Sequence, residues 1–463
     1  MPLPPQLIDR LQGIVGREGL LLDGDVHART TQGMRPEPLR AGVLVRPKTT
    51  ADVSAVLKLC HQARVAVVPQ GGLTGLVHGT DAEEGDVILS LERMNAVENI
   101  SASQRVAVVQ AGVSLQRLQE AAEDAGLFFP VDLGARGTAT VGGAVATNAG
   151  GNRVIRWGTM RDSVLGLEAV LADGAVLSSM NQVLKNNTGY DLKQLFIGAE
   201  GTLGVVTRIA VRLREAPVGR AMGLAALDSF EHVIALLKHM DRGLNGTLSA
   251  FEVLWDDFYE LVTTAPALSR PPLPHGHSHY VLLECLGGDP TRDQERFESA
   301  LGEAMEAGLV ADASIAQTER DCAALWAMRD DVQQMGRFGH PFAYDVSLPL
   351  ANTEAYTHAL RAGLHAAFGE HRCWFYGHLG DGNLHVVVQV PHPDAAAHAV
   401  VDALVYEPLA AQGGAISAEH GIGLDKKAWL HVSRNPVELT VMRRLKQALD
   451  PLGILNPGKL LPD

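Results

Sequence analysis

Apolar residues along the first half of the chain follow spacings that are typical of helices and buried strands. A helix is predicted after Thr50, where apolar side chains recur at helical spacing at Val53, Val56, Leu57 and Cys60. The apolar run over residues 65–68 predicts a buried strand, and a second helix is predicted from Ser114 to Gly126.

The pattern changes past residue 218, where strand, helix and strand follow one another and then repeat. The predicted strands are 221–227, 248–254, 280–285 and 309–315, and the predicted helices are 230–240, 292–307 and 436–449. In the first half, strands 164–171 and 175–178 flank the hairpin signal Asp173-Gly174. This order indicates a second domain in which helices pack on an antiparallel sheet.

Composition narrows the class of protein. At 463 residues the chain is long enough for two or three domains. A net charge of −14 argues against nucleic-acid binding. The four cysteines are scattered, which argues against an iron–sulfur domain or a disulfide framework. Residues 1–5 lack a basic start and an apolar run, and no later stretch reads as membrane-spanning, so we expect a cytoplasmic protein.

One segment carries the parts of a divalent metal site. Residues 377–385, GHLGDGNLH, place His378 and His385 seven residues apart across a Gly-Asp-Gly turn. Glu419 offers a third ligand and His420 a base, and three protein ligands leave coordination positions open for catalysis. The alternative is a plain strand entry with His385 facing solvent.

Two glycine-rich segments suggest a large cofactor. Residues 69–75, PQGGLTG, can turn consecutive backbone N–H groups toward a pyrophosphate. Residues 130–134 and 142–151 are also rich in small side chains, as expected where a flat group lies on backbone. Neither segment has the Rossmann spacing of a nicotinamide site. The alternative is that both are only tight turns.

These segments together resemble a known family. The chain carries, in order, PxGGxTG at 69–75, PxDLG at 130–134, GGAVATNAGG at 142–151, NTGYDL at 187–192, GAEGTLG at 198–204, GHxGDGNxH at 377–385, EHG at 419–421 and LNPGK at 455–459. It is similar to the FAD-linked dehydrogenases of D-2-hydroxy acids, which include D-lactate and D-2-hydroxyglutarate dehydrogenases. The resemblance implies an α+β protein with a vanillyl-alcohol-oxidase-type FAD-binding domain and an α+β substrate domain built on an antiparallel sheet.

The resemblance also implies domain roles and cofactor contacts. We expect an FAD-binding domain of two subdomains over 1–218, a substrate- and metal-binding domain over 219–421, and a C-terminal segment over 422–463 that returns to the FAD domain. The implied FAD-binding residues are Pro69, Gly71, Gly72, Leu73, Thr74, Gly75, Pro130, Asp132, Gly134, Gly142, Gly143, Thr147, Asn148, Gly150 and Asn456. Leu73 stands where relatives with covalent flavin have histidine, so non-covalent FAD is expected.

The implied reaction needs a metal, a base and an arginine. By resemblance, His378, His385 and Glu419 bind Zn²⁺ or Mn²⁺, and His420 takes the proton of the substrate hydroxyl while hydride leaves C2 for the flavin. Arg329 pairs with the substrate carboxylate, a planar group that suits a guanidinium. The alternative for Arg329 is a solvated helix face.

Substrate choice rests on three departures from the D-2-hydroxyglutarate enzymes, which have threonine, lysine and asparagine where this chain has Gln333, Ala343 and Val387. An unpaired distal carboxylate would be costly to bury there. We therefore favour D-lactate or another D-2-hydroxy acid with a short or apolar tail. The alternative is D-2-hydroxyglutarate, with Arg337 as a compensating cation.

Two other classes of function stay open at this point. A metal-dependent hydrolase could use the same histidines and Glu419, although it would not need the glycine-rich segments. A non-catalytic flavin-binding module would bind FAD without oxidising a hydroxy acid. For the dehydrogenase, the electron acceptor is expected to be an electron-transfer flavoprotein, a quinone or a cytochrome, and a homodimer is a further expectation.

Overall fold

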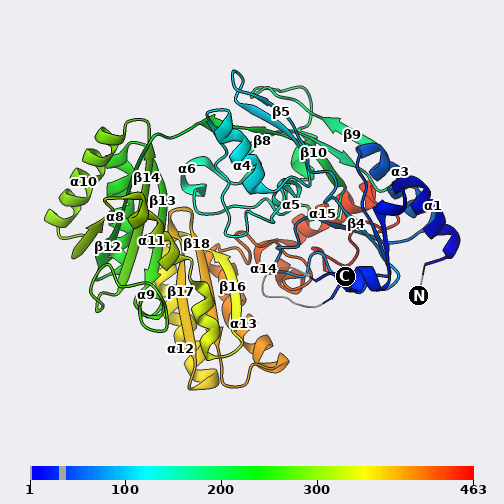
Figure 1. Cartoon of the computed structure of the whole chain (residues 1–463). Coiled ribbons are helices and arrows are strands. Elements are labelled where there is room, and N and C mark those ends of the chain that lie inside the picture. Colours follow the sequence, from blue (N-terminus) through cyan, green and yellow to red (C-terminus); the bar gives the residue numbers. More distant parts are fainter. Residues whose placement is uncertain (1–2, 31–37, 463) are drawn as a thin grey trace. The chain divides into compact units, whose positions relative to one another are not determined.

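The computed structural model describes residues 3–30 and 38–462, which form two compact units (Figure 1). Unit 1 comprises Met1–Gly150, Gly158–Ala216 and Glu419–Asp463, and unit 2 comprises Gly151–Trp157 and Pro217–Ala418. Packing alone defines these units. The functional domains assigned above to 1–218, 219–421 and 422–463 therefore stay predictions.

The first sheet of unit 1 has the strand order β1-β2-β4-β3, with β1 at Leu20–Leu22, β2 at Val43–Val45, β4 at Val87–Ser90 and β3 at Val67–Gln70. Helices α1 (Pro5–Val15) and α3 (Thr50–Ala63) pack together beside it. Helix α3 begins one residue earlier than predicted, because Thr49 rather than Thr50 is its N-cap and forms a capping box with Asp52. Strand β3 begins two residues later than predicted, because the Val65 N–H bonds back to the Cys60 carbonyl at the end of α3 at 3.0 Å.

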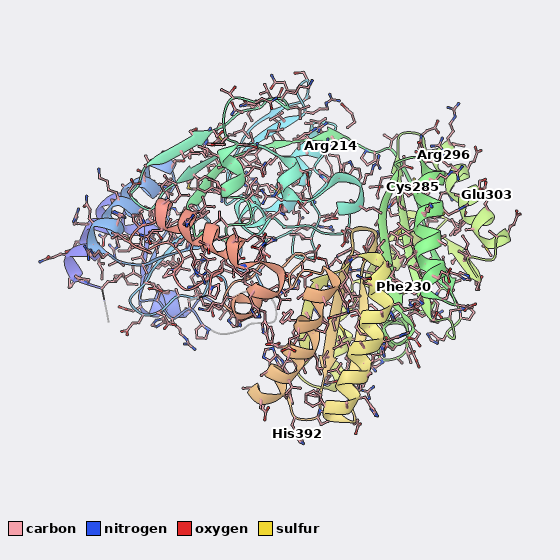
Figure 2. The ribbon with its side chains drawn as sticks, turned by 180° about the vertical axis from the view of Figure 1, so that it is seen from behind. Arg214, Phe230, Cys285, Arg296, Glu303 and His392 are labelled. Carbon is pink, nitrogen blue, oxygen red and sulfur yellow. The ribbon has the colours of Figure 1, made fainter. Side chains whose placement is uncertain are left out.

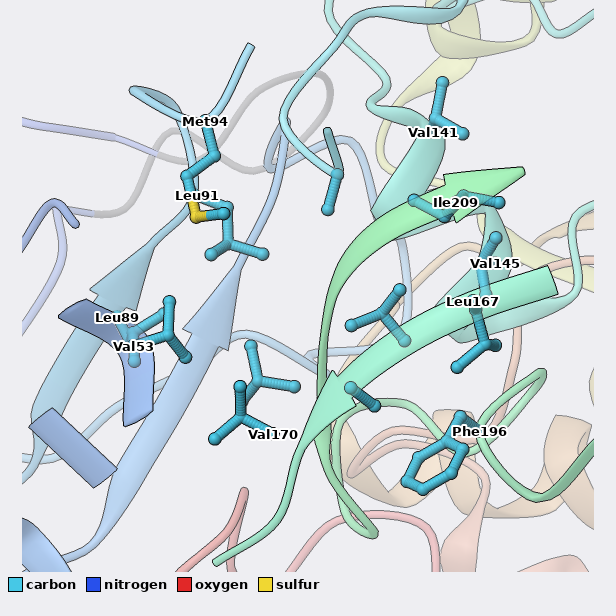
Figure 3. Close-up of a cluster of buried hydrophobic side chains, with 14 of the residues drawn as sticks. Val53, Leu89, Leu91, Met94, Val141, Val145, Leu167, Val170, Phe196 and Ile209 are labelled. Carbon is cyan, nitrogen blue, oxygen red and sulfur yellow. The ribbon is translucent and has the colours of Figure 1, made fainter. Parts of the chain in front are cut away.

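The second sheet of unit 1 is antiparallel, in the order β5-β6-β10-β8-β9. Its strands are β5 (Val97–Ser101), β6 (Val106–Gln110), β10 (Val205–Arg212), β8 (Val164–Val170) and β9 (Val176–Ser179). The predicted hairpin is confirmed, with Gly174 at a φ of 89° in its turn. Figure 3 shows part of the core, where Leu167 of β8 and Ile209 of β10 lie beside each other.

Shorter elements complete unit 1. The predicted helices after Ser114 and over 436–449 are confirmed as α4 and α15. The described part of unit 1 also contains α2 (Gly24–His27), α4 (Leu115–Asp124), α5 (Val141–Thr147), α7 (Met160–Ser163), α14 (Leu430–Ser433) and α15 (Pro436–Leu449), with the strand pair β7 (Leu127–Phe128) and β11 (Arg214–Glu215).

Unit 2 is built on one antiparallel sheet of seven strands, which confirms the predicted architecture. Its order is β15 (Asp312–Ile315), β12 (Gly219–Leu227), β14 (His279–Gly287), β13 (Leu248–Trp255), β17 (Arg372–His378), β18 (Asn383–Gln389) and β16 (Phe342–Ser347). Strand β15 begins three residues later than predicted, because residues 308 and 309 bond back to the end of the preceding helix.

Helices cover both faces of this sheet (Figure 1). Helices α8 (Phe230–Leu244) and α10 (Pro290–Glu306) pack on β12 and β14, and α12 (Leu350–Phe368) and α13 (Ala395–Gln412) lie along β16 to β18. In Figure 2, Arg296 and Glu303 mark the exposed side of α10. Helices α9 (Asp256–Thr263) and α11 (Glu319–Arg329) share a core with β13 and β17, and the short α6 (Val154–Trp157) contacts β13.

The described residues, 3–30 and 38–462, contain no candidate for a membrane-spanning helix. None of their helices combines the length and the apolar character that a bilayer crossing requires. The four cysteines are buried and free.

Candidate active site

Unit 1 contains a cavity of about 360 Å³, within the ~300–1,000 Å³ range of ligand sites. Its walls come from the end of β3, the start of α5 and the segment before β10. Glu419 and His420 also line it. Of the predicted cofactor residues, those that line the cavity are Pro69, Gly71, Gly72, Leu73, Thr74, Gly75, Gly134, Gly142, Gly143, Thr147 and Gly150.

Two glycines let the cavity walls approach each other. A Cβ at Gly72 would overlap the carbonyl oxygen of Thr138, and a Cβ at Gly71 would lie 2.5 Å from Thr140 Oγ1. At Gly75 a Cβ would meet nothing within 4 Å. Gly72 therefore allows packing of backbone on backbone and Gly71 makes room for the Thr140 side chain, while Gly75 leaves space at the wall of the cavity.

Pro130, Asp132 and Asn148 lie outside the lining of the cavity. Asp132 accepts hydrogen bonds from Arg136 Nη1 at 2.9 and 3.2 Å. Asn148 ends α5 in the left-handed conformation, and its Oδ1 accepts the Arg161 N–H at 3.0 Å. These contacts give both side chains a structural role behind the wall.

Asn456 ties the C-terminal tail to the cavity wall from behind. Its Nδ2 donates to the carbonyl oxygens of Gly79 at 3.0 Å and Glu200 at 2.7 Å, and both of these residues line the cavity. Its Oδ1 is buried and has no hydrogen-bond partner among the described residues. A buried acceptor of this kind fits a cofactor that brings its own N–H donor.

Glu200, which the sequence analysis did not single out, holds the turn that follows His420. Its two carboxylate oxygens accept the backbone N–H groups of Ile422 at 2.7 Å and Gly423 at 2.8 Å. Burial raises the pKa of this carboxyl, while the two N–H groups oppose that shift. The available signal was its place as the one charged residue in GAEGTLG, residues 198–204.

In unit 2, the predicted histidine pair is confirmed to converge. Strand β17 ends at His378, the turn passes through Gly382 at a φ of 85°, and β18 returns antiparallel to it. The two imidazole rings lie 5.3 Å apart between centroids. His378 is 5% exposed and His385 9%, so the alternative in which His385 faces solvent is wrong.

Glu252 on β13 is the second residue that the sequence analysis missed. Its Oε1 lies 2.5 Å from His378 Nδ1, and its Oε2 accepts from Arg329 Nε at 2.8 Å. Burial by itself would raise the pKa of the Glu252 carboxyl, but His378 and Arg329 lower it to about 2. A lone carboxylate in the apolar strand FEVLW, residues 251–255, was the available signal.

Arg329 ends α11 and is only 7% exposed, so the alternative of a solvated helix face is wrong. Besides Glu252, its guanidinium contacts Asp330 Oδ1 at 3.2 Å and lies 3.3 Å from His378 Nε2. A guanidinium has five N–H donors, and these contacts engage three of them. Donors therefore remain for a carboxylate ligand.

The chain leaves unit 2 beside His385. Asp345 is the cross-strand partner of His385, and its Oδ2 accepts the Ala418 N–H at 3.1 Å. Asn383 Nδ2 holds the other oxygen of Asp345 at 2.8 Å. Glu419 follows Ala418 directly in the chain, and one residue spans at most about 3.6 Å.

The cross-strand row next to His385 on the same sheet face is apolar. Val387 is the cross-strand partner of Ala343 and Trp374, so the three side chains point to the side that carries His385. Val387 is 3% exposed and Ala343 is exposed. We call Trp374, Val387 and Ala343 the apolar row.

The polar candidates for a substrate tail lie in the 3₁₀ segment η3 (Val332–Phe338). Gln333 is exposed. Arg337, the predicted compensating cation, donates to Gln334 Oε1 and to the Ala265 carbonyl, both at 3.3 Å. Its guanidinium is therefore directed to its own segment and to the loop after α9.

Two protein-family models match this chain: "FAD binding domain" over residues 41–179 and "FAD linked oxidases, C-terminal domain" over 216–460. It is 42% identical over 421 residues to D-2-hydroxyglutarate dehydrogenase, mitochondrial, of Bos taurus, covering 91% of this chain and 77% of that one. D-2-hydroxyglutarate dehydrogenase of Xanthomonas citri pv. viticola is 38% identical over 435 residues, covering 93% and 90%. A putative mitochondrial D-lactate dehydrogenase of Schizosaccharomyces pombe is 34% identical over 475 residues, covering 99% and 90%.

Solved structures share the fold at low sequence identity. An alkyldihydroxyacetonephosphate synthase matches with a TM-score of 0.76 at 17% identity, covering 99% of this chain and 87% of that chain. p-Cresol methylhydroxylase matches with a TM-score of 0.75 at 15% identity, covering 98% and 96%. These likenesses concern the fold alone.

Proposed function

Because this chain belongs to the family of FAD-linked D-2-hydroxy acid dehydrogenases, with their vanillyl-alcohol-oxidase-type fold, we propose that it oxidises D-2-hydroxyglutarate to the 2-oxo acid. The names of the relatives favour this substrate over D-lactate, which the sequence analysis favoured. Membership of this family favours the dehydrogenase over the metal-dependent hydrolase and the non-catalytic flavin-binding module. One observation of the structure carries the proposal: buried Arg329 and His378 share Glu252 on the face that presents His385.

The residues fit a divalent cation. We propose His378, His385 and Glu419 as ligands of Zn²⁺ or Mn²⁺, since two imidazoles and a carboxylate form a common donor set for these ions. Glu252 occupies Nδ1 of His378, which leaves Nε2 for the metal. When bound, the ion would lower the pKa of a substrate hydroxyl. His378 Nε2 would then hold the ion instead of accepting from Arg329, and the Arg329 N–H groups would serve the substrate carboxylate.

His420 is the proposed base. It lines the cavity that we assign to FAD, and Glu200 holds the turn behind it. FAD, when bound, supplies the hydride acceptor. His420 would accept the hydroxyl proton of the substrate as the C2 hydride leaves, because a neutral imidazole has a ring nitrogen that can accept a proton.

A second candidate substrate is D-lactate or another D-2-hydroxy acid with an apolar tail. The apolar row favours it, because Trp374, Val387 and Ala343 offer no cation to a distal carboxylate. For reoxidation of the flavin, we keep an electron-transfer flavoprotein, a quinone or a cytochrome as candidate acceptors. A cytoplasmic location and a homodimer also remain proposals.

The proposal is tested by mixing FAD-loaded protein anaerobically with D-2-hydroxyglutarate, its L-enantiomer and D-lactate, with Zn²⁺ or Mn²⁺ added. We expect the absorbance of oxidised flavin to disappear rapidly with D-2-hydroxyglutarate alone. Treatment with a chelator, and separately His420→Ala, should slow the loss at least ~100-fold. Bleaching by D-lactate alone would favour the second candidate, and no bleaching by any D-acid would contradict the dehydrogenase.

A further inference from the structure

We propose that Glu252 is a positioning residue that couples the metal ligand His378 to the substrate-binding Arg329. The inference rests on the proposed function, which assigns those two roles. Each oxygen of the Glu252 carboxylate serves one partner: Oε1 lies 2.5 Å from His378 Nδ1, and Oε2 lies 2.8 Å from Arg329 Nε. One side chain thereby sets the orientation of both groups.

The backbone keeps Glu252 in place for this task. It lies within β13, where its cross-strand partners are His378 on β17 and Leu282 on β14, and the residue is 0% exposed. A carboxylate in such a place is costly unless both oxygens are paired. An apolar side chain would satisfy the surrounding strand FEVLW better, so packing alone does not account for a glutamate here.

The contact with His378 selects a tautomer. A carboxylate at Nδ1 holds the proton on that nitrogen and leaves the Nε2 lone pair for a cation. The contact with Arg329 fixes the guanidinium through Nε, so its two terminal NH₂ groups project beyond Glu252. The same carboxylate thus prepares a metal-binding atom and a carboxylate-binding fork side by side.

Glu284 provides a matched control on the same sheet. It lies on the neighbouring strand β14, opposite Ala250, and is also 0% exposed. It pairs with two arginines, Arg220 at 2.8 Å and Arg153 at 3.4 Å. It has the burial and the ion pairs of Glu252 without contact to a histidine, so it reports the cost of altering a buried carboxylate in this sheet.

The test compares Glu252→Gln with Glu284→Gln. His378 Nδ1–H and Arg329 Nε–H are both donors, so an amide, with one acceptor oxygen, loses one of the two contacts in either orientation. In FAD-loaded protein, Zn²⁺ and Mn²⁺ affinities are measured by competition with a chromophoric chelator, and kcat and KM are measured for D-2-hydroxyglutarate. We expect Glu252→Gln to weaken metal binding ~10–100-fold or to raise KM by a similar factor. Glu284→Gln should stay within about threefold in both.

The outcomes separate this inference from the proposed function. Wild-type protein that binds neither ion would overturn the metal assignment itself. If wild type and Glu252→Gln bind metal equally and share one KM, Glu252 has no positioning role. Should Glu252→Gln fail to fold, Glu252→Asp retains the charge but is one methylene too short to span both partners. Glu252→Asp is then expected to weaken metal binding or to raise KM as stated for Glu252→Gln. Unchanged metal affinity and KM in Glu252→Asp would overturn the inference.

Discussion

The carboxylate of Glu200 accepts the backbone N–H of Ile422, with 2.7 Å between Oε1 and the nitrogen. The second oxygen accepts Gly423 N–H at 2.8 Å, so one side chain closes the turn directly after His420. Gly421, inside this turn, has a φ of 84° and packs against the same carboxylate. The orientation of the proposed base therefore depends on a residue more than two hundred positions earlier in the chain.

Glu200→Ala should lower both stability and catalysis. Two N–H groups would lose their partner, and each unsatisfied buried donor costs roughly 1–3 kcal/mol. We expect the free energy of unfolding to fall by ~2–5 kcal/mol and kcat to fall at least ~10-fold, measured by urea unfolding and by steady-state kinetics. Glu200→Gln keeps one acceptor oxygen, so its stability and kcat should lie between those of wild type and Glu200→Ala. A kcat within twofold of wild type for Glu200→Ala would show that the turn does not position His420.

Gly72→Ala and Gly75→Ala form a matched pair for the cavity assigned to FAD. The new Cβ at Gly72 would overlap the backbone at Thr138, whereas at Gly75 it enters open space. Because overpacking costs about 1–3 kcal/mol, Gly72→Ala should lower stability and the flavin content of the purified protein. Gly75→Ala should fold as wild type. If Gly75→Ala folds as wild type and yet loses flavin, the cofactor itself occupies the space beside Gly75.

His279 predicts a pH dependence of stability. Burial lowers its pKa to about 4, and it packs against Phe230 and Trp255 with ring centroids 5.6 and 5.1 Å away. In the unfolded chain this histidine has a pKa near 6.5, so between pH ~6.5 and 4 the unfolded chain binds a proton that the folded chain does not. The contribution of His279 to the free energy of unfolding is therefore fully present above pH ~6.5 and is lost as the pH falls toward 4.

The measurement for His279 is urea unfolding followed by tryptophan fluorescence at pH 7 and pH 5. Protonation of His279 on unfolding should lower the free energy of unfolding of the wild-type protein by about 2 kcal/mol between pH 7 and pH 5. His279→Phe, which suits the aromatic neighbours, should lack that part of the loss. Equal losses of unfolding free energy in the two proteins would mean that folding does not lower the pKa of His279.

Ala343→Lys tests the apolar row. The Ala343 side chain is exposed and belongs to the face that carries His385, so a longer side chain has room there. A new ammonium group should pair with a distal carboxylate and raise kcat/KM for D-2-hydroxyglutarate relative to D-lactate about 10-fold. Ala343→Met supplies length without charge and should leave that ratio unchanged. An unchanged ratio in Ala343→Lys would place the tail of the substrate away from this row.

Local sequence predicted most of the secondary structure and the chemical type of the site. Capping residues, hairpin turns and apolar periodicity are local signals, so α3, α15 and the β8–β9 hairpin lie where the pattern indicates. The spacing of His378 and His385 predicted their convergence for the same reason, because the turn between them is a short-range feature. The glycine-rich segments likewise predicted a cavity wall.

Long-range pairing decided the rest. Glu252 reaches His378 only because β13 pairs with β17, 126 positions away in sequence, and no local pattern encodes that register. The same holds for Glu200 and the turn after His420, and for the burial of Arg329. Sequence by itself determined which residue types are present for chemistry. The tertiary structure decided which carboxylates pair with the site residues, because a buried charged group needs a partner and the fold determines which partners lie within reach.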